Sequence, residues 1–199
     1  MFGNKSESWL IVGLGNPGKE YEKTRHNCGF RAIDVLADKL GCKVDKGKFQ
    51  GLYGQTVNGG KKLYLLKPQT FMNLSGQAVT EAISFHKVPA ERVIVIMDDI
   101  SLEPGKMRIR RKGSDGGQKG MRDIIELLGN NEIMRIKIGV GKKPHPQYDL
   151  ADWVLSKFKA DEKENLDSAL KKSNLALKEI FARGIDSAMN KYNGMTFDE

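Results

Sequence analysis

One histidine of this sequence lies among polar side chains that could take part in acid–base chemistry. His26 belongs to the stretch GLGNPGKEYEKTRHNCGF, which follows the apolar run WLIV and also contains Asn16, Tyr21 and Asn27. An imidazole has a pKa near neutrality, so it can take a proton at physiological pH and return it later. His26 is therefore the candidate general base, whereas His86, on a predicted helix face, and His145, between two prolines, are interpreted as structural.

A carboxylate is expected beside this histidine. Asp98 and Asp99 follow the apolar run RVIVIM, and WLIVGL precedes the loop of His26, so each run predicts a buried strand. If the two strands are parallel neighbours, an aspartate and His26 meet at the carboxyl edge of the sheet, where ligands bind in open α/β folds. Such a pair could activate a water for attack on a carbonyl, with the amides of Asn16 and Asn73 holding the substrate or its oxyanion.

Other chemistry is less well supported. The glycines at 13, 15 and 18 have the spacing of a dinucleotide-binding loop, but that loop needs a helix that begins at the glycines. Here the polar segment KEYEKTRHN follows, and helical periodicity begins only near Phe30. Cys28 is interpreted as packing at a helix start and Ser75 as a helix cap rather than as nucleophiles. No spacing of histidines, cysteines and carboxylates indicates a metal site.

The segments that must position these residues alternate between strand and helix patterns. Strands are predicted at WLIVGL, RVIVIM, KMRIRR and RIKIGVG, and a hairpin at GLYGQTV and KKLYLL around Asn58–Gly60. Helical periodicity covers residues 30–40, 78–85, 124–128 and much of the charged segment beyond Pro146. The order predicts an α/β fold with a twisted mixed, mostly parallel sheet flanked by helices, formed by residues 1–199 as a single domain.

Composition limits the partners. Lys and Arg number 33 against 25 Asp and Glu, so the formal net charge of +8 favours an anionic partner such as nucleic acid. No apolar run has the roughly 20 residues that cross a membrane, so no membrane partner is expected. The N-terminus does not have the pattern of a signal peptide, and only two cysteines are present, which predicts a cytoplasmic location.

Several motifs together resemble the bacterial peptidyl-tRNA hydrolase family. They occur in order over roughly residues 8 to 190: GLGNPGKEYEKTRHNCGF, KPQTFMNLSG, the run from Asp98 to Lys106, the glycine loop before RDIIELLGN, and DLADWVLSKF. The resemblance implies hydrolysis of the ester between a peptide and the 3′-terminal ribose of tRNA, which recycles tRNA for translation. It also implies a monomer that uses no metal and no organic cofactor.

The same resemblance assigns roles to individual positions. His26 matches the general base of the family. Asp98, rather than Asp99, matches the carboxylate that keeps this base basic. Asn16 matches the residue that helps to tell a peptidyl group from a free aminoacyl group. The residues expected to contact the tRNA acceptor end or the ester are Tyr21, Phe71, Met72 and Asn73. The cations expected to hold the tRNA 5′ phosphate are Arg110 and Lys137. The two cations lie on predicted strands whose other face is apolar, which leaves a wet face for phosphate.

One motif departs from the family. The usual Gly-His-Asn-Gly reads Gly117-Gln118-Lys119-Gly120 in this chain. A lysine cannot accept a hydrogen bond as an amide can, so Lys119 either contacts phosphate or this wall binds substrate differently.

A non-catalytic RNA-binding module on the same fold is the alternative function. It would need the cations but not His26 and Asp98, and it would favour more than the 8% of aromatic residues found here.

Overall fold

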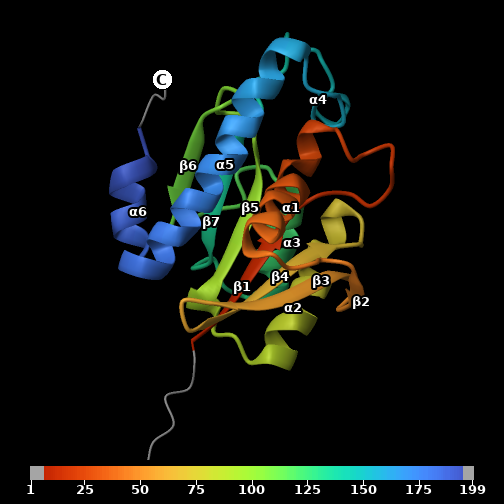
Figure 1. The fold of residues 1–199 in the computed structure, drawn as a ribbon. Helices are drawn as coiled ribbons and strands as arrows, with labels where there is room; N and C mark the ends of the chain where they lie inside the picture. Colours follow the sequence, from red (N-terminus) through yellow and green to blue (C-terminus); the bar gives the residue numbers. More distant parts are fainter. Residues whose placement is uncertain (1–6, 195–199) are drawn as a thin grey trace, which may run out of the picture.

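The computed structural model describes residues 7–194, whose strands form one twisted sheet with helices on both faces (Figure 1). The strand order is β2-β3-β4-β1-β5-β7-β6. The central strands are parallel: β4 (Lys61–Pro68), β1 (Ser8–Gly13), β5 (Val93–Asp99) and β7 (Met134–Gly139). Antiparallel pairs lie at the two edges, with β2 (Lys46–Lys48), β3 (Gly51–Asn58) and β6 (Met107–Arg110). The predicted fold class is confirmed, and the parallel pairing lies in the centre of the sheet.

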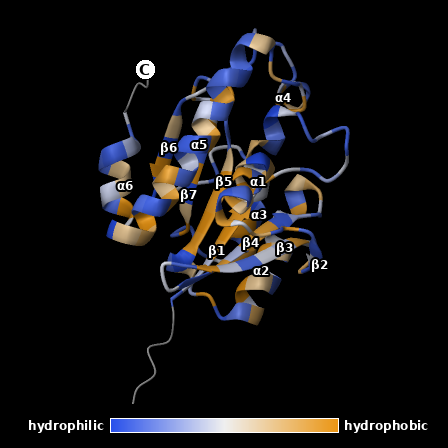
Figure 2. Ribbon diagram, viewed as in Figure 1, coloured by the Kyte–Doolittle hydropathy of each residue, from blue (hydrophilic) through white to orange (hydrophobic). Residues whose placement is uncertain are grey.

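Each face of the sheet has its own hydrophobic core. One core lies under α1 (Cys28–Leu40), α5 (Ala160–Arg183) and α6 (Ile185–Tyr192), and the other under α2 (Ser75–His86) and α3 (Lys119–Leu128). Alternate residues of β1 enter the two cores, Ile11 the first and Val12 the second. A strand covered on both faces must be apolar throughout, which explains the run WLIV and the orange central strands of Figure 2.

Some local predictions were incomplete. The C-terminal helical run divides into α5 and α6 at Gly184, whose φ of +87° ends the first helix. The sequence pattern did not predict the edge strand β2, the short helix α4 (Leu150–Val154) or the 3₁₀ helices η1 (Arg25–Asn27), η2 (Met72–Leu74) and η3 (Ala90–Arg92). The capping role predicted for Ser75 is wrong, because its hydroxyl donates to the Met72 carbonyl instead of accepting from a helix amide.

Two glycines let α1 lie directly against the sheet. A Cβ at Gly13 would collide with the Gly29 carbonyl oxygen, and a Cβ at Gly29 would collide with the carbonyl oxygen of Ile96 on β5. Gly15 is similar, because an added Cβ would lie 2.7 Å from the ring of Phe30. Gly13 and Gly15, two of the three glycines that mimic a dinucleotide-binding motif, thus serve close packing, and α1 begins only at Cys28. This packing brings the loop after β1 over the carboxyl edge of the sheet.

Arg25 joins that loop to the C-terminal part of the chain. Its side chain is only 1% exposed, and its guanidinium donates to the Val140 carbonyl at 2.8 Å, to Ser156 Oγ at 3.2 Å and to Glu162 at 2.7 Å. The guanidinium also lies 3.9 Å from the centre of a Trp153 ring. Because Arg25 precedes His26, these contacts fix the backbone that carries the histidine.

We expect Arg25→Ala to lower the free energy of unfolding by about 3 kcal/mol, because a buried carbonyl and Glu162 lose their charged donor and a cavity forms. Urea unfolding measures the difference. Arg31→Ala is the matched control, because Arg31 forms a more exposed ion pair with Asp167 and should cost no more than about 1 kcal/mol. Equal losses in the two variants would contradict a special role for Arg25.

Candidate active site

His26 and Asp98 lie in contact at the carboxyl edge of the sheet. β1 and β5 are parallel neighbours, with Gly13 beside Ile96, so the loop after β1 reaches the end of β5. His26 Nδ1 is 2.8 Å from Asp98 Oδ2, and their side chains are 12% and 4% exposed. The expected meeting of an aspartate and His26 at this edge is confirmed. Asp99 has other partners: its Oδ1 accepts from Ser101, and its Oδ2 accepts from Lys137.

Opposing influences set the basicity of His26. Burial lowers its pKa, whereas the charge of Asp98 and the hydrogen bond to Asp98 raise it, and Lys119 lowers it again. The result is a pKa above the ordinary value for histidine. A carboxylate partner makes Nδ1 the donor, so Nε2 is the nitrogen that can accept a proton. Burial meanwhile raises the pKa of the Cys28 thiol well above its ordinary value, which does not suit a nucleophile.

Gln118 completes the surroundings of Asp98, although the sequence did not predict it as a site residue. Its Oε1 accepts from the Met121 amide and caps α3, while its Nε2 lies 3.2 Å from Asp98 Oδ1 and 3.0 Å from Met72 Sδ. Both oxygens of Asp98 are thereby bound, one by His26 and the other by Gln118. The only available signal was a glutamine immediately before a helical pattern, which indicates a cap but not its distant partner.

Asn16 is fixed on three sides. Its backbone N–H and carbonyl each bond to the Asn27 side chain at 2.9 Å, and its Oδ1 accepts from the Met72 amide at 2.8 Å. Asn16 is 9% exposed, and its Nδ2 forms no hydrogen bond with residues 7–194. That N–H group is therefore available to a ligand. Asn27 holds the backbone of Asn16, and the Met72 amide orients its side chain.

A cavity of about 810 Å³ brings most of the predicted residues together. The predicted residues that line it are Asn16, His26, Phe71, Met72, Asn73, Asp98, Lys119 and Lys137. Phe71 is 60% exposed, so a large aromatic face is open to a ligand. Tyr21 and Arg110 are not among the lining residues, and the structure therefore does not bring these two into the cleft.

The predicted wet and positive face is only partly present. The β6–β7 register places Arg108 beside Lys137 and Arg110 beside Arg135 on one face, and the two arginines of β6 are exposed. Lys137 instead pairs with Asp99 at 2.9 Å and is 17% exposed. Arg135 is buried and donates to the carbonyls of residues 113, 114, 131 and 133. The expectation of a wet face is thus correct on β6 and wrong on β7, because the 113–118 loop covers it.

The arrangement suits proton transfer to and from a small group in the cleft. His26 Nε2 can take a proton, Asp98 can stabilise the resulting imidazolium, and Asn16 offers an N–H donor nearby. Within residues 7–194, no three His, Cys, Asp or Glu side chains are grouped as a metal ion would require.

Comparison with known proteins gives one consistent result. The family model described as peptidyl-tRNA hydrolase matches residues 10–199. Proteins named peptidyl-tRNA hydrolase from Thermoanaerobacter sp. (strain X514) and from Lachnospira eligens are 53% and 52% identical to this chain over 186 residues; each alignment covers 94% of this chain and 100% of the relative. The crystal structure of peptidyl-tRNA hydrolase from Acinetobacter baumannii matches with a TM-score of 0.89 at 34% identity, covering 96% of this chain and 97% of that one.

The ion-pair geometry predicts how the pKa of His26 responds to substitution. Asp98→Asn should bring the pKa of His26 below the ordinary histidine value, because burial and Lys119 still lower it when the carboxylate is gone. Lys119→Ala should shift the same pKa upward. NMR titration of the His26 ring protons measures both shifts, with His145 as an internal reference. Parallel shifts in the two variants would contradict the opposing effects of Asp98 and Lys119.

Proposed function

The chain belongs to the peptidyl-tRNA hydrolase family, and we propose that His26 and Asp98 carry out its reaction by activating a water molecule. The family hydrolyses an ester and acts on peptidyl-tRNA, so the substrate is a tRNA whose 3′-terminal ribose carries a peptide. The observation that supports these roles best is the contact of 2.8 Å between His26 Nδ1 and Asp98 Oδ2 in the wall of the large cleft.

The reaction proceeds by general-base and then general-acid catalysis. Asp98 keeps the proton of His26 on Nδ1, and Nε2 removes a proton from water as the water oxygen attacks the ester carbonyl. The Asn73 amide or backbone N–H groups stabilise the oxyanion. When the tetrahedral intermediate collapses, the bond to the ribose oxygen breaks and the imidazolium returns the proton to that oxygen. The products are a peptide with a free carboxyl group and a tRNA with a free ribose hydroxyl.

Other cleft residues discriminate and hold the substrate in this proposal. Asn16 presents its Nδ2 as a hydrogen-bond donor. This donor is compatible with a blocked peptidyl group but repels the protonated amine of an aminoacyl group. Phe71 and Met72 supply apolar contact beside the ester. Lys119, exposed at the start of α3, contacts a phosphate of the acceptor end. Tyr21, Arg110 and Lys137 remain candidates for tRNA contact, and Lys137 would first have to exchange its Asp99 partner.

The remaining features of the proposal concern assembly and location. We propose that residues 1–199 act as one domain and as a monomer in the cytoplasm. No helix within residues 7–194 is long and apolar enough to span a bilayer. The alternative of a non-catalytic RNA-binding module has no specific support, because such a module would have no need for a buried contact between His26 and Asp98.

We expect His26→Ala to reduce the rate of hydrolysis by at least about 10² to 10⁴-fold while binding is largely kept, because a general base contributes that much. Release of N-acetyl-aminoacyl groups from tRNA under single-turnover conditions measures the rate, and filter binding measures the affinity. His145→Ala is the control and should keep the full rate. Wild-type turnover by His26→Ala would rule out the proposed mechanism.

The rate should also depend on pH through His26. Only the neutral imidazole can accept a proton, so kcat should fall as the pH drops below the raised pKa of His26. In Asp98→Asn the same acidic limb should move to lower pH, together with a loss of maximal rate, because the carboxylate no longer raises the pKa. A pH–rate profile whose acidic limb does not move in Asp98→Asn would assign the limb to another group.

A further inference from the structure

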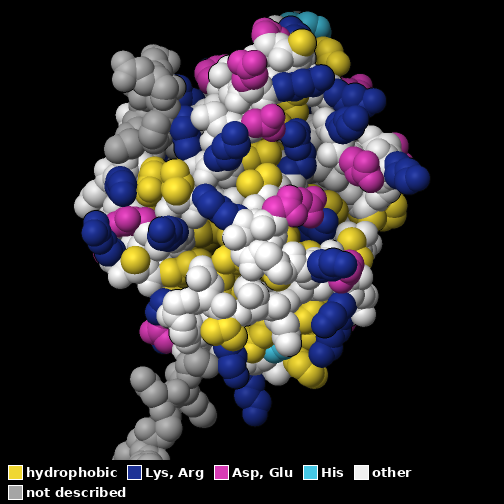
Figure 3. Space-filling view, viewed as in Figure 1, with side chains coloured by type: hydrophobic (Ala, Val, Ile, Leu, Met, Phe, Trp, Pro, Cys, Tyr) yellow, Lys and Arg dark blue, Asp and Glu magenta, His cyan; other side chains and the backbone are white. Residues whose placement is uncertain are grey.

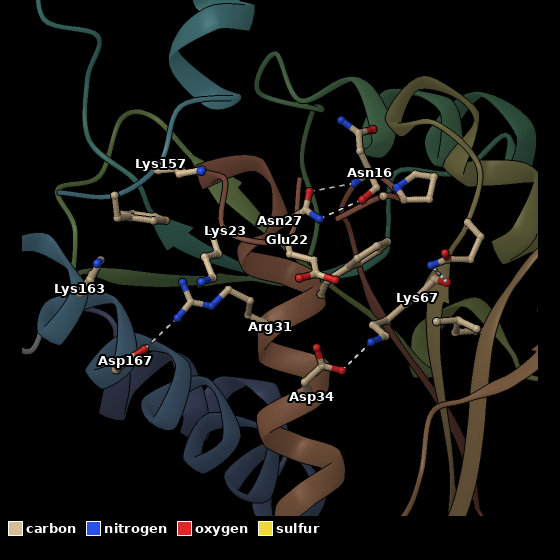
Figure 4. A pocket seen from close by; sticks show the side chains of 16 residues that line it. Asn16, Glu22, Lys23, Asn27, Arg31, Asp34, Lys67, Lys157, Lys163 and Asp167 are labelled. Carbon is tan, nitrogen blue, oxygen red and sulfur yellow. Dashed lines mark hydrogen bonds and ion pairs between the residues drawn. The ribbon is translucent and has the colours of Figure 1, made fainter. Parts of the chain in front are cut away.

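A second cavity lies beside the catalytic cleft. It has a volume of about 620 Å³, and Asn16 is the one residue that lines both cavities within residues 7–194. Its walls come from the loop after β1, the first turns of α1, the adjoining part of β3 and β4, and residues 157–167 (Figure 4). We call it the basic cavity, because Lys23, Arg31, Lys67, Lys157 and Lys163 line it.

Three of these cations have no partner within the described part of the chain. Arg31 pairs with Asp167 and Lys67 with Asp34, whereas Lys23, Lys157 and Lys163 form no ion pair or hydrogen bond through their side chains. In Figure 4 these three lysines come from different segments and lie on the same side of the cavity. Figure 3 likewise shows basic side chains close together over the start of α5 and the loop after β1. Unpaired cations around one hollow attract an anionic ligand with several charges.

The backbone holds two of these lysines in place. Thr24 and Lys157 form an isolated antiparallel β-bridge, and the Arg25 amide donates to the Ser156 carbonyl at 3.0 Å. Lys23 therefore immediately precedes Thr24, whose backbone pairs with that of Lys157 in this short β-bridge. Arg25 reinforces this ladder through Ser156 and Glu162, one residue from Lys163. The lysines thus project from a backbone that is already ordered.

The two cavities differ in charge. The basic cavity has five cationic side chains and three carboxylates, whereas the catalytic cleft has three cationic side chains and six carboxylates. Two of the three cleft cations are already paired, Lys137 with Asp99 and Arg122 with Asp115. A polyanion is therefore favoured in the basic cavity and disfavoured in most of the cleft.

We propose that the basic cavity binds the phosphodiester backbone of the single-stranded 3′ end of tRNA, with Lys23, Lys157 and Lys163 neutralising its phosphates. This inference rests on the proposed function, because the ester in the cleft is attached to the terminal ribose of that strand. The strand passes Asn16, which borders both cavities, so the ribose reaches His26 while the preceding phosphates lie among the lysines.

The first test replaces Lys23, Lys157 and Lys163 together by glutamine in the full-length chain. Affinity for deacylated tRNA is measured over a range of salt concentrations. Each neutralised phosphate of a single strand contributes about 0.7 to the slope of log K against log salt, so the slope should become less steep by about 2. The affinity at low salt should fall at least about tenfold, and the loss in turnover should appear in KM rather than in kcat.

A control variant carries the same change in net charge at other places. Lys39, Lys62 and Lys178 are exposed, line neither cavity and have no side-chain partner within residues 7–194. Their joint replacement by glutamine should leave the salt slope and KM close to the wild-type values. If the two triple variants behave alike, net charge explains the effect and the basic cavity is not the RNA site.

A second measurement identifies the ligand group. A short RNA with the sequence of the tRNA 3′ end is made with one phosphate replaced by a neutral methylphosphonate at each position in turn. A methylphosphonate at one or more positions should lower the affinity of the RNA for the wild type. The same substitutions should not change its affinity for the lysine triple variant. If the triple variant instead changes KM according to the charge of the peptide, with RNA affinity unchanged, the cavity binds peptide and the proposal is wrong.

Failure of this inference can be told apart from failure of the proposed function. If the wild type hydrolyses N-acetyl-aminoacyl-tRNA and the lysine triple variant matches its control, the function stands and the RNA site is refuted. If the wild type binds tRNA through the three lysines but does not hydrolyse the ester, the basic cavity stands and the proposed function is refuted.

Discussion

A buried guanidinium joins two segments of the chain that both contribute to the two cavities. Arg25 follows β1 in sequence, yet its partners Val140, Ser156 and Glu162 belong to the C-terminal third. A charge removed from water is stable only when its donors are all satisfied, so this contact permits little freedom in the position of the loop. His26 is the next residue, and the segment that Arg25 holds supplies walls to both cavities. The site geometry therefore depends on an interaction that takes no part in the reaction.

Neutral amide side chains lie beside Asp98 and Asn16. Gln118 donates to the free oxygen of Asp98, and Asn27 fixes Asn16, so both site residues are oriented by side chains that carry no charge at any pH. A cation in the place of Gln118 would lie close to Asp98 and weaken its influence on His26. At residues 118 and 119, where this chain departs from the usual family motif, Gln118 is a neutral donor to Asp98, and Lys119 is a cation in the cleft wall.

The sequence predicts the parts of this structure that local patterns determine. Apolar runs predict β1 and β5, and once these are parallel neighbours the meeting of His26 and Asp98 follows from the geometry of the sheet. Partners distant in sequence leave no such pattern. Nothing in KMRIRR or RIKIGVG shows that Lys137 pairs with Asp99 or that a loop covers Arg135, so a wet face was predicted where an ion pair and buried carbonyl contacts lie. Arg25 and Gln118 were missed for the same reason.

The division of charge between the two cavities follows from a conflict in the chemistry. A tRNA is a polyanion and must be held by cations, but each cation close to His26 lowers the pKa of the imidazole and so weakens the base, as Lys119 already does. The carboxylate of Asp98 has the opposite effect and raises the pKa of the imidazole. Lysines on the far side of Asn16 can attract phosphates through solvent, where screening limits their effect on the buried His26–Asp98 pair. If RNA binds in the basic cavity as we propose, one small protein combines RNA binding with a basic histidine.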